Sequence, residues 1–217
     1  MRNMKPLSYQ YIETQINSEG PDKLQARQFS QELGLDAISI SPTEASLISF
    51  ITKSIRPQKI VEIGTLTGLS SLYFLETLGL DGKFWTFEKS TEHASFAGRS
   101  LAKAIESGQC QIKIGDAIKE LPTIENEGPF DVIFIDGNKS AYYDYWVWAK
   151  NNLRVEGLIF IDNVFLAGSV WGESTSQKFS EKQINTVKKM TQEIMSDSDF
   201  DSTLVPTTEG LLIARKR

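Results

Sequence analysis

Acidic and amide side chains follow two apolar runs of the sequence, at positions where parallel strands would end. Asp136 comes directly after the run Asp131–Ile135, and Asp162 and Asn163 come after Leu158–Ile161. Adjacent strands of a parallel sheet bring such ends close together. Two carboxylates and an amide oxygen suit Mg²⁺ or Ca²⁺ better than zinc, which prefers nitrogen and sulfur ligands. The three residues therefore predict a divalent-metal site, with Mg²⁺ as the expected ion and Ca²⁺ or Mn²⁺ as alternatives.

Lys139 follows Asp136 by three residues, so its side chain can enter the same pocket. A free lysine has a pKa of about 10.4 and is a poor base at neutral pH, but a neighbouring dication lowers both this pKa and that of an acceptor hydroxyl. Lys139 and Asp136 are therefore the predicted catalytic residues, with Lys139 as the base. In the simpler reading, Lys139 is a surface charge and Asp162-Asn163 caps a loop. Two strand ends together favour the site.

The segment Val61–Gly68 has the residues of a ligand-binding turn between a strand and a helix. Gly64 and Gly68 let the backbone pass close to a bound molecule, because a Cβ there would collide with it or forbid the required φ. Their spacing after Glu62 is Gly-x-x-x-Gly rather than the Gly-x-Gly-x-x-Gly of dinucleotide sites, so a nicotinamide cofactor is the second choice. S-adenosylmethionine carries an ammonium and a sulfonium, which suit acidic residues and hydroxyls such as Ser70.

Two later strand ends carry groups that could bind the rest of the same cofactor. Glu88 ends the second predicted strand, where a carboxylate can accept hydrogen bonds from both ribose hydroxyls. Gly115-Asp116-Ala117 ends the third, beside the expected position of the adenine. Each feature alone is explained equally well by a solvated strand end or an ordinary turn. Their occurrence on successive strand ends favours a site for the methyl donor.

From residue 59 onward, short apolar runs alternate with stretches of helix length, which is typical of βαβ units and a parallel sheet. Ser202–Pro206 and Leu211–Arg215 flank the turn signal Glu209-Gly210, so the last strands are expected to pair as an antiparallel hairpin. The other expected strands are Lys59–Ile63, Lys83–Phe87, Gln111–Ile114, Asp131–Ile135 and Leu158–Ile161. The predicted fold class is α/β, with helices on both faces of a mostly parallel sheet.

Residues 7–55 contain no strand pattern and are predicted to form helices that break at Gly20-Pro21 and Ser41-Pro42, where the serine can cap a helix. The buried stripe of that helix is expected to consist of Leu47, Ile48, Phe50 and Ile51. Gly168–Lys182 is rich in Ser, Thr, Gly and Gln, which predicts a mobile loop before a helix over Ile184–Met195.

The length, composition and net charge of the chain limit the classes of protein to which it can belong. Its 217 residues fit one domain, in which residues 1–57 supply helices near the site and residues 58–217 form the core. Cys110 is the only cysteine and His93 the only histidine, which excludes an internal disulfide and a thiolate zinc site and disfavours Ser/His/Asp catalysis. A net charge of −5 does not suggest the basic surface that binds nucleic acid or an anionic membrane. With no membrane-spanning run or signal-peptide pattern, a cytoplasmic location is expected.

The chain resembles the divalent-metal-dependent O-methyltransferases, the family that includes the caffeoyl-CoA and catechol enzymes. The resemblance runs nearly end to end, and the motifs that carry it are Ile38–Glu44, Glu62-Ile63-Gly64-Thr65, Thr67-Gly68-Leu69-Ser70, Glu88, Gly115-Asp116-Ala117, Asp136-Gly137-Asn138-Lys139, Tyr142, Tyr145, Gly157–Asn163 and Val205-Pro206 to Gly210. It implies a Rossmann-like class I methyltransferase fold with a seven-stranded sheet, and, by analogy, a homodimer.

The resemblance also implies roles for individual residues. Asp136, Asp162 and Asn163 match the metal ligands, and Lys139 matches the base that takes a proton from one hydroxyl of a vicinal diol. The residues expected to contact S-adenosylmethionine are Ile40 through its backbone, Glu62, Gly64, Thr65, Ser70, Glu88, Asp116, Ala117, Asp136 and Tyr145. The expected reaction is methyl transfer to a hydroxyl of a catechol-like or caffeoyl-like phenolic small molecule.

Several positions depart from the family pattern, and other functions stay open. Asn138 stands where many members have a second aspartate, Leu166 where a tryptophan is common, and Ala45 where a glycine is common. The alternatives are a tRNA hydroxyuridine methyltransferase, which the acidic net charge disfavours, an inactive cofactor-binding module, and a nicotinamide-dependent oxidoreductase. An aromatic wall for a planar acceptor, or ordinary core packing, would explain Phe165, Trp171 and Tyr142.

Overall fold

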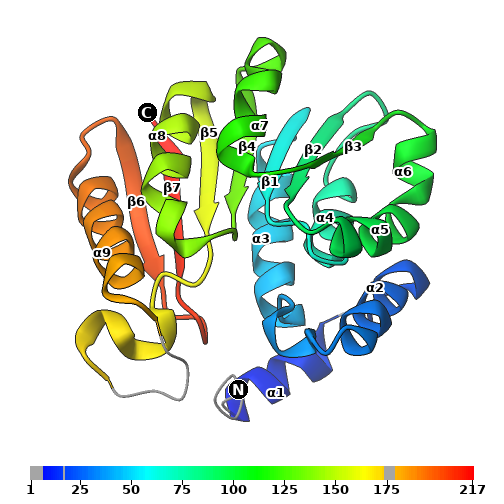
Figure 1. Cartoon of the computed structure of the whole chain (residues 1–217), viewed down its shortest axis with the longest axis horizontal. Coiled ribbons are helices and arrows are strands. Elements are labelled where there is room, and N and C mark those ends of the chain that lie inside the picture. The colour runs from blue at the N-terminus through cyan, green and yellow to red at the C-terminus, as the bar shows by residue number, and fades with distance from the viewer. Residues whose placement is uncertain (1–6, 17, 174–178) are drawn as a thin grey trace.

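A seven-stranded sheet with the order β3-β2-β1-β4-β5-β7-β6 forms the centre of the computed structural model, which describes residues 7–16, 18–173 and 179–217 (Figure 1). The strands are β1 (Lys59–Ile63), β2 (Lys83–Glu88), β3 (Cys110–Ile114), β4 (Phe130–Ile135), β5 (Leu153–Ile161), β6 (Phe200–Val205) and β7 (Leu211–Lys216). Strands β1 to β5 pair in parallel, whereas β7 pairs antiparallel with both β5 and β6. The predicted parallel sheet with a C-terminal antiparallel hairpin is confirmed.

Helices cover both faces of this sheet, as predicted. The α-helices are α1 (Leu7–Gln15), α2 (Pro21–Glu32), α3 (Pro42–Ser54), α4 (Leu69–Leu75), α5 (Thr91–Ser100), α6 (Ala102–Glu106), α7 (Ala117–Glu120), α8 (Tyr142–Asn152) and α9 (Glu181–Ser196). The short 3₁₀ helices are η1 (Asp36–Ile38), η2 (Leu121–Glu127), η3 (Lys139–Ala141) and η4 (Leu166–Trp171).

The strands separate two apolar cores because successive side chains point to opposite faces of the sheet. Val61 and Ile63 of β1 face a core that includes Trp146 of α8 and Met190 of α9. Ile60, the neighbour of Val61 in sequence, belongs to the other core, which helices α2 to α5 cover. Since both faces of the central strands are buried, these strands read as continuous apolar runs. That pattern is why the sequence located them well.

The N-terminal breaks are where the sequence predicted them. Ser41 caps α3, with its side chain accepting a hydrogen bond from the backbone N–H of Glu44 while the Glu44 side chain accepts one from the backbone of Ser41. This capping box fixes the start of the helix. The prediction for Phe50 was wrong: its side chain is 76% exposed, whereas Ile48 is buried as expected.

The segment predicted as a loop before the last helix is only partly one. Residues 168–171 of this segment belong to the 3₁₀ helix η4 and residues 181–182 begin α9, while residues 174–178 lie outside the described residues. The backbone is left-handed at Asn163, between β5 and η4, and at Leu166 and Ala167, the first two residues of η4. Within the described part of the chain, we find no helix with the length and apolar character needed to cross a membrane.

Candidate functional site

A cavity of about 420 Å³ opens at the carboxyl ends of the parallel strands, where open α/β sheets bind their ligands. Its volume lies in the range of roughly 300–1,000 Å³ that is usual for small-molecule sites. Of the residues predicted from the sequence, its wall contains Gly64, Glu88, Asp116, Ala117, Asp136, Lys139, Tyr145 and Asn163. A small recess beside it is lined by Ile40, Thr65 and Ser70, and it shares Gly64 and Asp136 with the main cavity. Groups from distant parts of the sequence therefore meet at one edge of the sheet.

Gly64 allows the turn after β1 to lie against the end of β4. Its φ is +105°, and a Cβ at this position would lie 2.2 Å from the carbonyl oxygen of Asp136. The turn is held in place because Gly64 N–H donates to Phe87 O at 3.0 Å and Asp136 N–H donates to Ile63 O at 2.9 Å. No other residue fits without displacing Asp136. The glycine therefore places Asp136 at the cavity wall.

Glu88, which the sequence assigns to the ribose, lines the cavity. Its Oε2 accepts a hydrogen bond from the backbone N–H of Leu66 at 2.9 Å, and its Oε1 accepts one from Ser90 N–H at 2.8 Å. A carboxylate has further lone pairs, so these bonds orient Glu88 and leave capacity for hydroxyls of a ligand. His93, which the sequence did not assign to the site, also lines the cavity, with Nδ1 3.6 Å from Glu88 Oε1.

Asp116 and Ala117 lie at the end of the cavity predicted for the adenine. Asp116 caps α7, since its Oδ1 accepts from Ile118 N–H at 3.1 Å, and its Oδ2 pairs with Lys89 Nζ at 3.2 Å. These contacts lower the pKa of Asp116, the hydrogen bond from Lys89 being the main cause. The carboxylate is thus ionised and fixed beside the small side chain of Ala117.

Glu62 lines neither the main cavity nor the recess, although the sequence predicts that it contacts the cofactor. Its side chain is fully buried under α4, where Oε1 accepts from Ser70 Oγ and Oε2 accepts from Ser71 and Thr86 hydroxyls. Ser70 lines the recess, so Glu62 orients a hydroxyl that reaches the cavity wall. Burial raises the pKa of Glu62 to about 7, although the three hydroxyl groups oppose that rise.

This raised pKa makes the stability of the fold depend on pH. Below its ordinary pKa of 4.5 Glu62 is protonated in both states, and the stabilising effect of its proton is lost as the pH rises through about 7. We expect Glu62→Gln, which cannot ionise, to reduce the fall in unfolding free energy between about pH 4.5 and pH 8 by about 3 kcal/mol. Urea unfolding at the two pH values measures this. The matched variant Glu106→Gln, at an exposed site, should retain the wild-type dependence, and an equal dependence in Glu62→Gln would contradict the prediction.

The predicted metal ligands follow neighbouring strands. Ile135 and Ile161 are register partners in β4 and β5, and Asp162 N–H continues the pairing by donating to Ile135 O at 3.0 Å. Asp136 and Asn163 line the cavity, while Asp162 is buried behind it with Oδ1 accepting from Asn163 N–H at 2.7 Å. Among the described residues no group of three Asp, Glu, His or Cys side chains is placed to hold a metal, so a site here needs the amide as a ligand.

The amide of Asn163 fits that role. Its Nδ2 atom is buried and has no hydrogen-bond partner in the described part of the chain. Rotating the side-chain amide by half a turn exchanges its nitrogen and its oxygen, so this position can supply either a hydrogen-bond donor or an oxygen ligand. The left-handed backbone of Asn163, with φ +60°, turns the chain here directly after Asp162. Two carboxylates and one available amide are a hard donor set, which suits Mg²⁺.

Lys139 is fixed by two partners beside this set. Its Nζ donates to Asp136 Oδ1 at 2.8 Å and to Tyr142 Oη at 2.7 Å, and its side chain is 14% exposed. Tyr142 in turn donates to the backbone carbonyl of Asp162 at 3.1 Å. Burial, with the charges of Asp136 and Asp162, raises the pKa of Tyr142 well above its ordinary value. The phenol therefore stays protonated and ties Lys139 to the segment that carries the metal ligands.

The aromatic wall is only partly as predicted. Tyr142 is fully buried and serves Lys139, so it offers no surface to an acceptor. Phe165 and Trp171 do form an edge-to-face pair, with ring centroids 5.3 Å apart, and Trp171 is 59% exposed. Phe179, which the sequence did not single out, lines the cavity instead. It lies in the polar segment before α9, where composition gave no sign of an aromatic contact.

Comparisons with known proteins relate the chain to enzymes that transfer methyl groups. The family model described as O-methyltransferase matches residues 16–217. The chain is 34% identical to a catechol O-methyltransferase of Niastella koreensis, over 77% of this chain and 76% of that protein, and 25% identical to a caffeoyl-CoA O-methyltransferase of Stellaria longipes, over 96% and 89%. The crystal structure of the O-methyltransferase TomG from Streptomyces achromogenes, in complex with SAM, superposes with a TM-score of 0.86 at 26% identity, covering 97% of this chain and 96% of that one. These similarities favour a methyl donor over a nicotinamide cofactor.

Proposed function

Because the chain belongs to the O-methyltransferase family and is an S-adenosylmethionine-dependent enzyme, we propose that it methylates one hydroxyl of a catechol-like or caffeoyl-like phenol with the help of a divalent cation. The observation that carries this proposal is the meeting of Lys139, Asp136 and Asn163 at one wall of the cavity. A base, a carboxylate and a hard amide ligand are what deprotonation of a diol requires.

S-adenosylmethionine supplies the methyl group: the S–CH₃ bond breaks, an O–CH₃ bond forms, and the acceptor hydroxyl releases a proton. In the main cavity, Glu88 would accept hydrogen bonds from the ribose hydroxyls and Ala117 would pack beside the adenine. Gly64 leaves room for the methionine end of the donor against Asp136, whose negative charge favours the cationic donor. Holding donor and acceptor in contact supplies a large part of the rate enhancement.

Lys139 takes the proton from the acceptor hydroxyl. The Nζ atom donates hydrogen bonds to Asp136 and to Tyr142. In the neutral amine, its lone pair is then left to accept the proton of the acceptor hydroxyl. Asp136, Asp162 and Asn163 would hold a divalent cation, whose charge lowers the pKa of the acceptor hydroxyl. The buried Tyr142 stays protonated throughout, and its hydroxyl links Lys139 to the backbone carbonyl of Asp162.

Incubation with catechol or caffeate, labelled S-adenosylmethionine and Mg²⁺ tests the proposed function. We expect a monomethylated product whose formation stops in EDTA. Donor binding measured by calorimetry without transfer to either phenol would instead support the alternative of an inactive cofactor-binding module.

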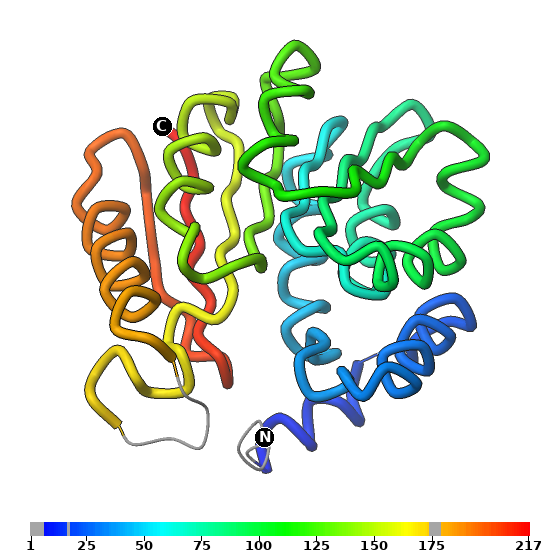
Figure 2. The backbone as a smooth tube through the Cα atoms, viewed as in Figure 1, coloured from blue at the N-terminus to red at the C-terminus, as the bar shows by residue number. Residues whose placement is uncertain are grey.

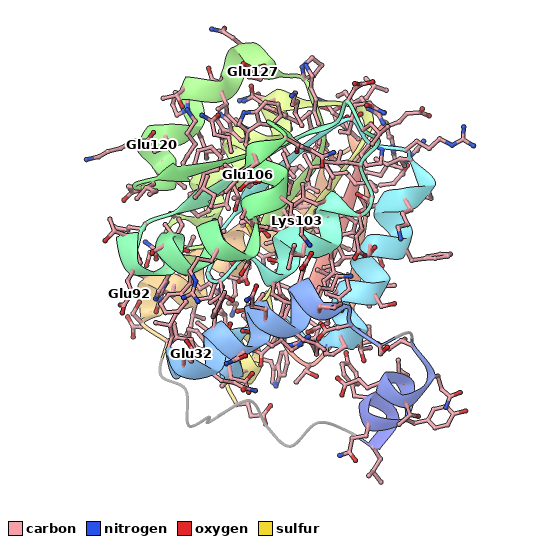
Figure 3. All side chains as sticks on the ribbon, turned by 90° about the vertical axis from the view of Figure 1, so that its right-hand side faces the viewer. Glu32, Glu92, Lys103, Glu106, Glu120 and Glu127 are labelled. Carbon is pink, nitrogen blue, oxygen red and sulfur yellow. The ribbon has the colours of Figure 1, made fainter. Side chains whose placement is uncertain are left out.

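The alternative tRNA acceptor has less support. Figure 3 shows Glu32, Glu92, Glu106, Glu120 and Glu127 on one side of the molecule, and the single labelled lysine there, Lys103, pairs with Asp22 at 2.8 Å. Such a surface repels a phosphate backbone. A tRNA transcript in the same assay, methylated faster than the phenols, would reverse this order. The homodimer and the cytoplasmic location expected from the sequence stay predictions.

A further inference from the structure

Glu44 carries a buried carboxylate oxygen that the fold does not use. The residue is 2% exposed and is the third residue of α3. Its Oε2 serves the capping box, accepting from Ser41 Oγ at 2.7 Å, whereas its Oε1 is buried and accepts no hydrogen bond from any described residue. Leaving a buried carboxylate oxygen without a donor is costly, so such a group calls for an explanation.

Helix α3, which carries Glu44, is linked through α1 to the turn between β6 and β7. Helix α1 packs on α3, and its Tyr9 hydroxyl accepts from Thr208 N–H, in the turn between β6 and β7, at 3.2 Å. Burial raises the pKa of Tyr9, and the charges of Glu44 and, more weakly, Asp162 add to that rise. Helix α1 therefore connects α3 with the turn between β6 and β7.

The β6–β7 turn is itself bonded to the segment of the proposed metal ligands. Val164 N–H donates to Gly210 O and Phe165 N–H donates to Glu209 O, each at 3.0 Å. Thr207 of this turn has a buried hydroxyl with no hydrogen-bond partner among the residues that the structure describes. Figure 2 shows α1 and the chain from β5 to η4 at the same end of the sheet. The turn that carries the unused hydroxyl of Thr207 is thus bonded to the two residues that directly follow Asp162 and Asn163.

We propose that Glu44 is a specificity-determining residue, which accepts a hydrogen bond from a donor group on the acceptor and disfavours acceptors that carry a carboxylate. The proposal rests on the methyl transfer proposed above. An ammonium or hydroxyl on the side of the ring away from the reacting diol would satisfy Oε1, whereas the charge of Glu44 would repel a carboxylate at the same position.

The test compares dopamine, which carries an ammonium, with caffeate, which carries a carboxylate, at saturating donor and Mg²⁺. We expect the wild-type kcat/KM for dopamine to exceed that for caffeate by about tenfold, mainly through KM, because one ion contact in a partly buried site is worth that much. Glu44→Gln should reduce the ratio to about two or less, since a glutamine keeps the capping box but loses the charge. The exposed Glu106→Gln should keep the wild-type ratio.

Each outcome bears on a different claim. A wild-type preference for caffeate, or a ratio that Glu44→Gln leaves unchanged, overturns the role of Glu44. Methylation of neither phenol overturns the proposed function itself. An equal loss on both phenols together with a lower Tm in Glu44→Gln assigns the residue to the cap alone and likewise overturns the proposal.

Discussion

Replacing Lys139 by methionine is expected to lower kcat by about 10²- to 10⁴-fold, because the acceptor proton then has no base to receive it. Methionine matches the length of the lysine stem, so the packing around Tyr142 should persist. The dissociation constant of S-adenosylmethionine should stay within about twofold, because Lys139 acts on the acceptor rather than on the donor. Single-turnover methyl transfer and calorimetry measure the two quantities separately.

Two further variants separate the base from a fixed positive charge. Lys139→Arg keeps an ion pair with Asp136 but cannot give up a proton, so we expect it to be as slow as the methionine variant. Lys119→Met, an exposed lysine on α7, should behave as wild type. Full activity of Lys139→Arg would show that charge alone is required, and a kcat of Lys139→Met within about threefold of wild type would remove Lys139 from the mechanism.

Removing the divalent cation with EDTA should reduce methyl transfer by about 10²-fold or more, and added Mg²⁺ should restore it. Asp162→Ala should cause a loss of similar size that Mg²⁺ at ordinary concentrations does not restore, because one of two carboxylate ligands is gone. Initial rates over a titration of Mg²⁺ measure both effects. Donor binding at wild-type affinity would show that the variant is folded.

Asp81→Ala, at an exposed turn before β2, is the matched control and should keep the wild-type response to Mg²⁺. Undiminished transfer in EDTA would refute a metal role at this site. A loss in Asp162→Ala without any response of the wild type to EDTA would assign Asp162 to the support of Lys139, through the hydrogen bond from Tyr142 to its carbonyl.

The sheet and the strand ends could be predicted because they follow from local patterns. Buried parallel strands are continuous apolar runs, and the residue after each run lies at the same edge of the sheet. That rule placed Glu88, Asp116 and Asp136 at one cavity without any knowledge of contacts. The breaks before α2 and α3 were equally local, since proline fits only the first turn of a helix.

The role of Glu62 could not be predicted in the same way. Glu62 lies one residue before the end of β1, and its side chain points to the face of the sheet that α4 covers, opposite to the side chains of Val61 and Ile63. The alternation along the strand indicates this face but not the partners of the carboxylate. Its three hydroxyl partners come from α4 and β2, and only the packed structure brings them together. The carboxylate therefore supports the site instead of lining it.

Sequence patterns do not predict the side-chain contacts of Lys139 and Glu44. For Tyr142 the sequence leaves an acceptor contact and core packing equally open, and the structure shows a buried ring whose hydroxyl binds Lys139. Glu44 was read only as part of a matching motif, and its unused oxygen becomes apparent once the capping box is resolved. Phe50 was assigned to the core by helical spacing, but no element of the described chain covers that face of α3.

The hairpin that closes the sheet has a consequence for the order in which the protein acquires its activity during synthesis. All residues that line the donor end of the cavity precede Asn152, whereas the acceptor side depends on the turn from Thr207 to Gly210, which is bonded to Val164 and Phe165. Strand β7 also lies between β5 and β6, so β6 has no partner in the sheet until β7 has left the ribosome. With the donor and acceptor ends assigned as proposed, we expect a nascent chain to complete its donor pocket before its acceptor pocket and to transfer methyl groups only when β7 is in place.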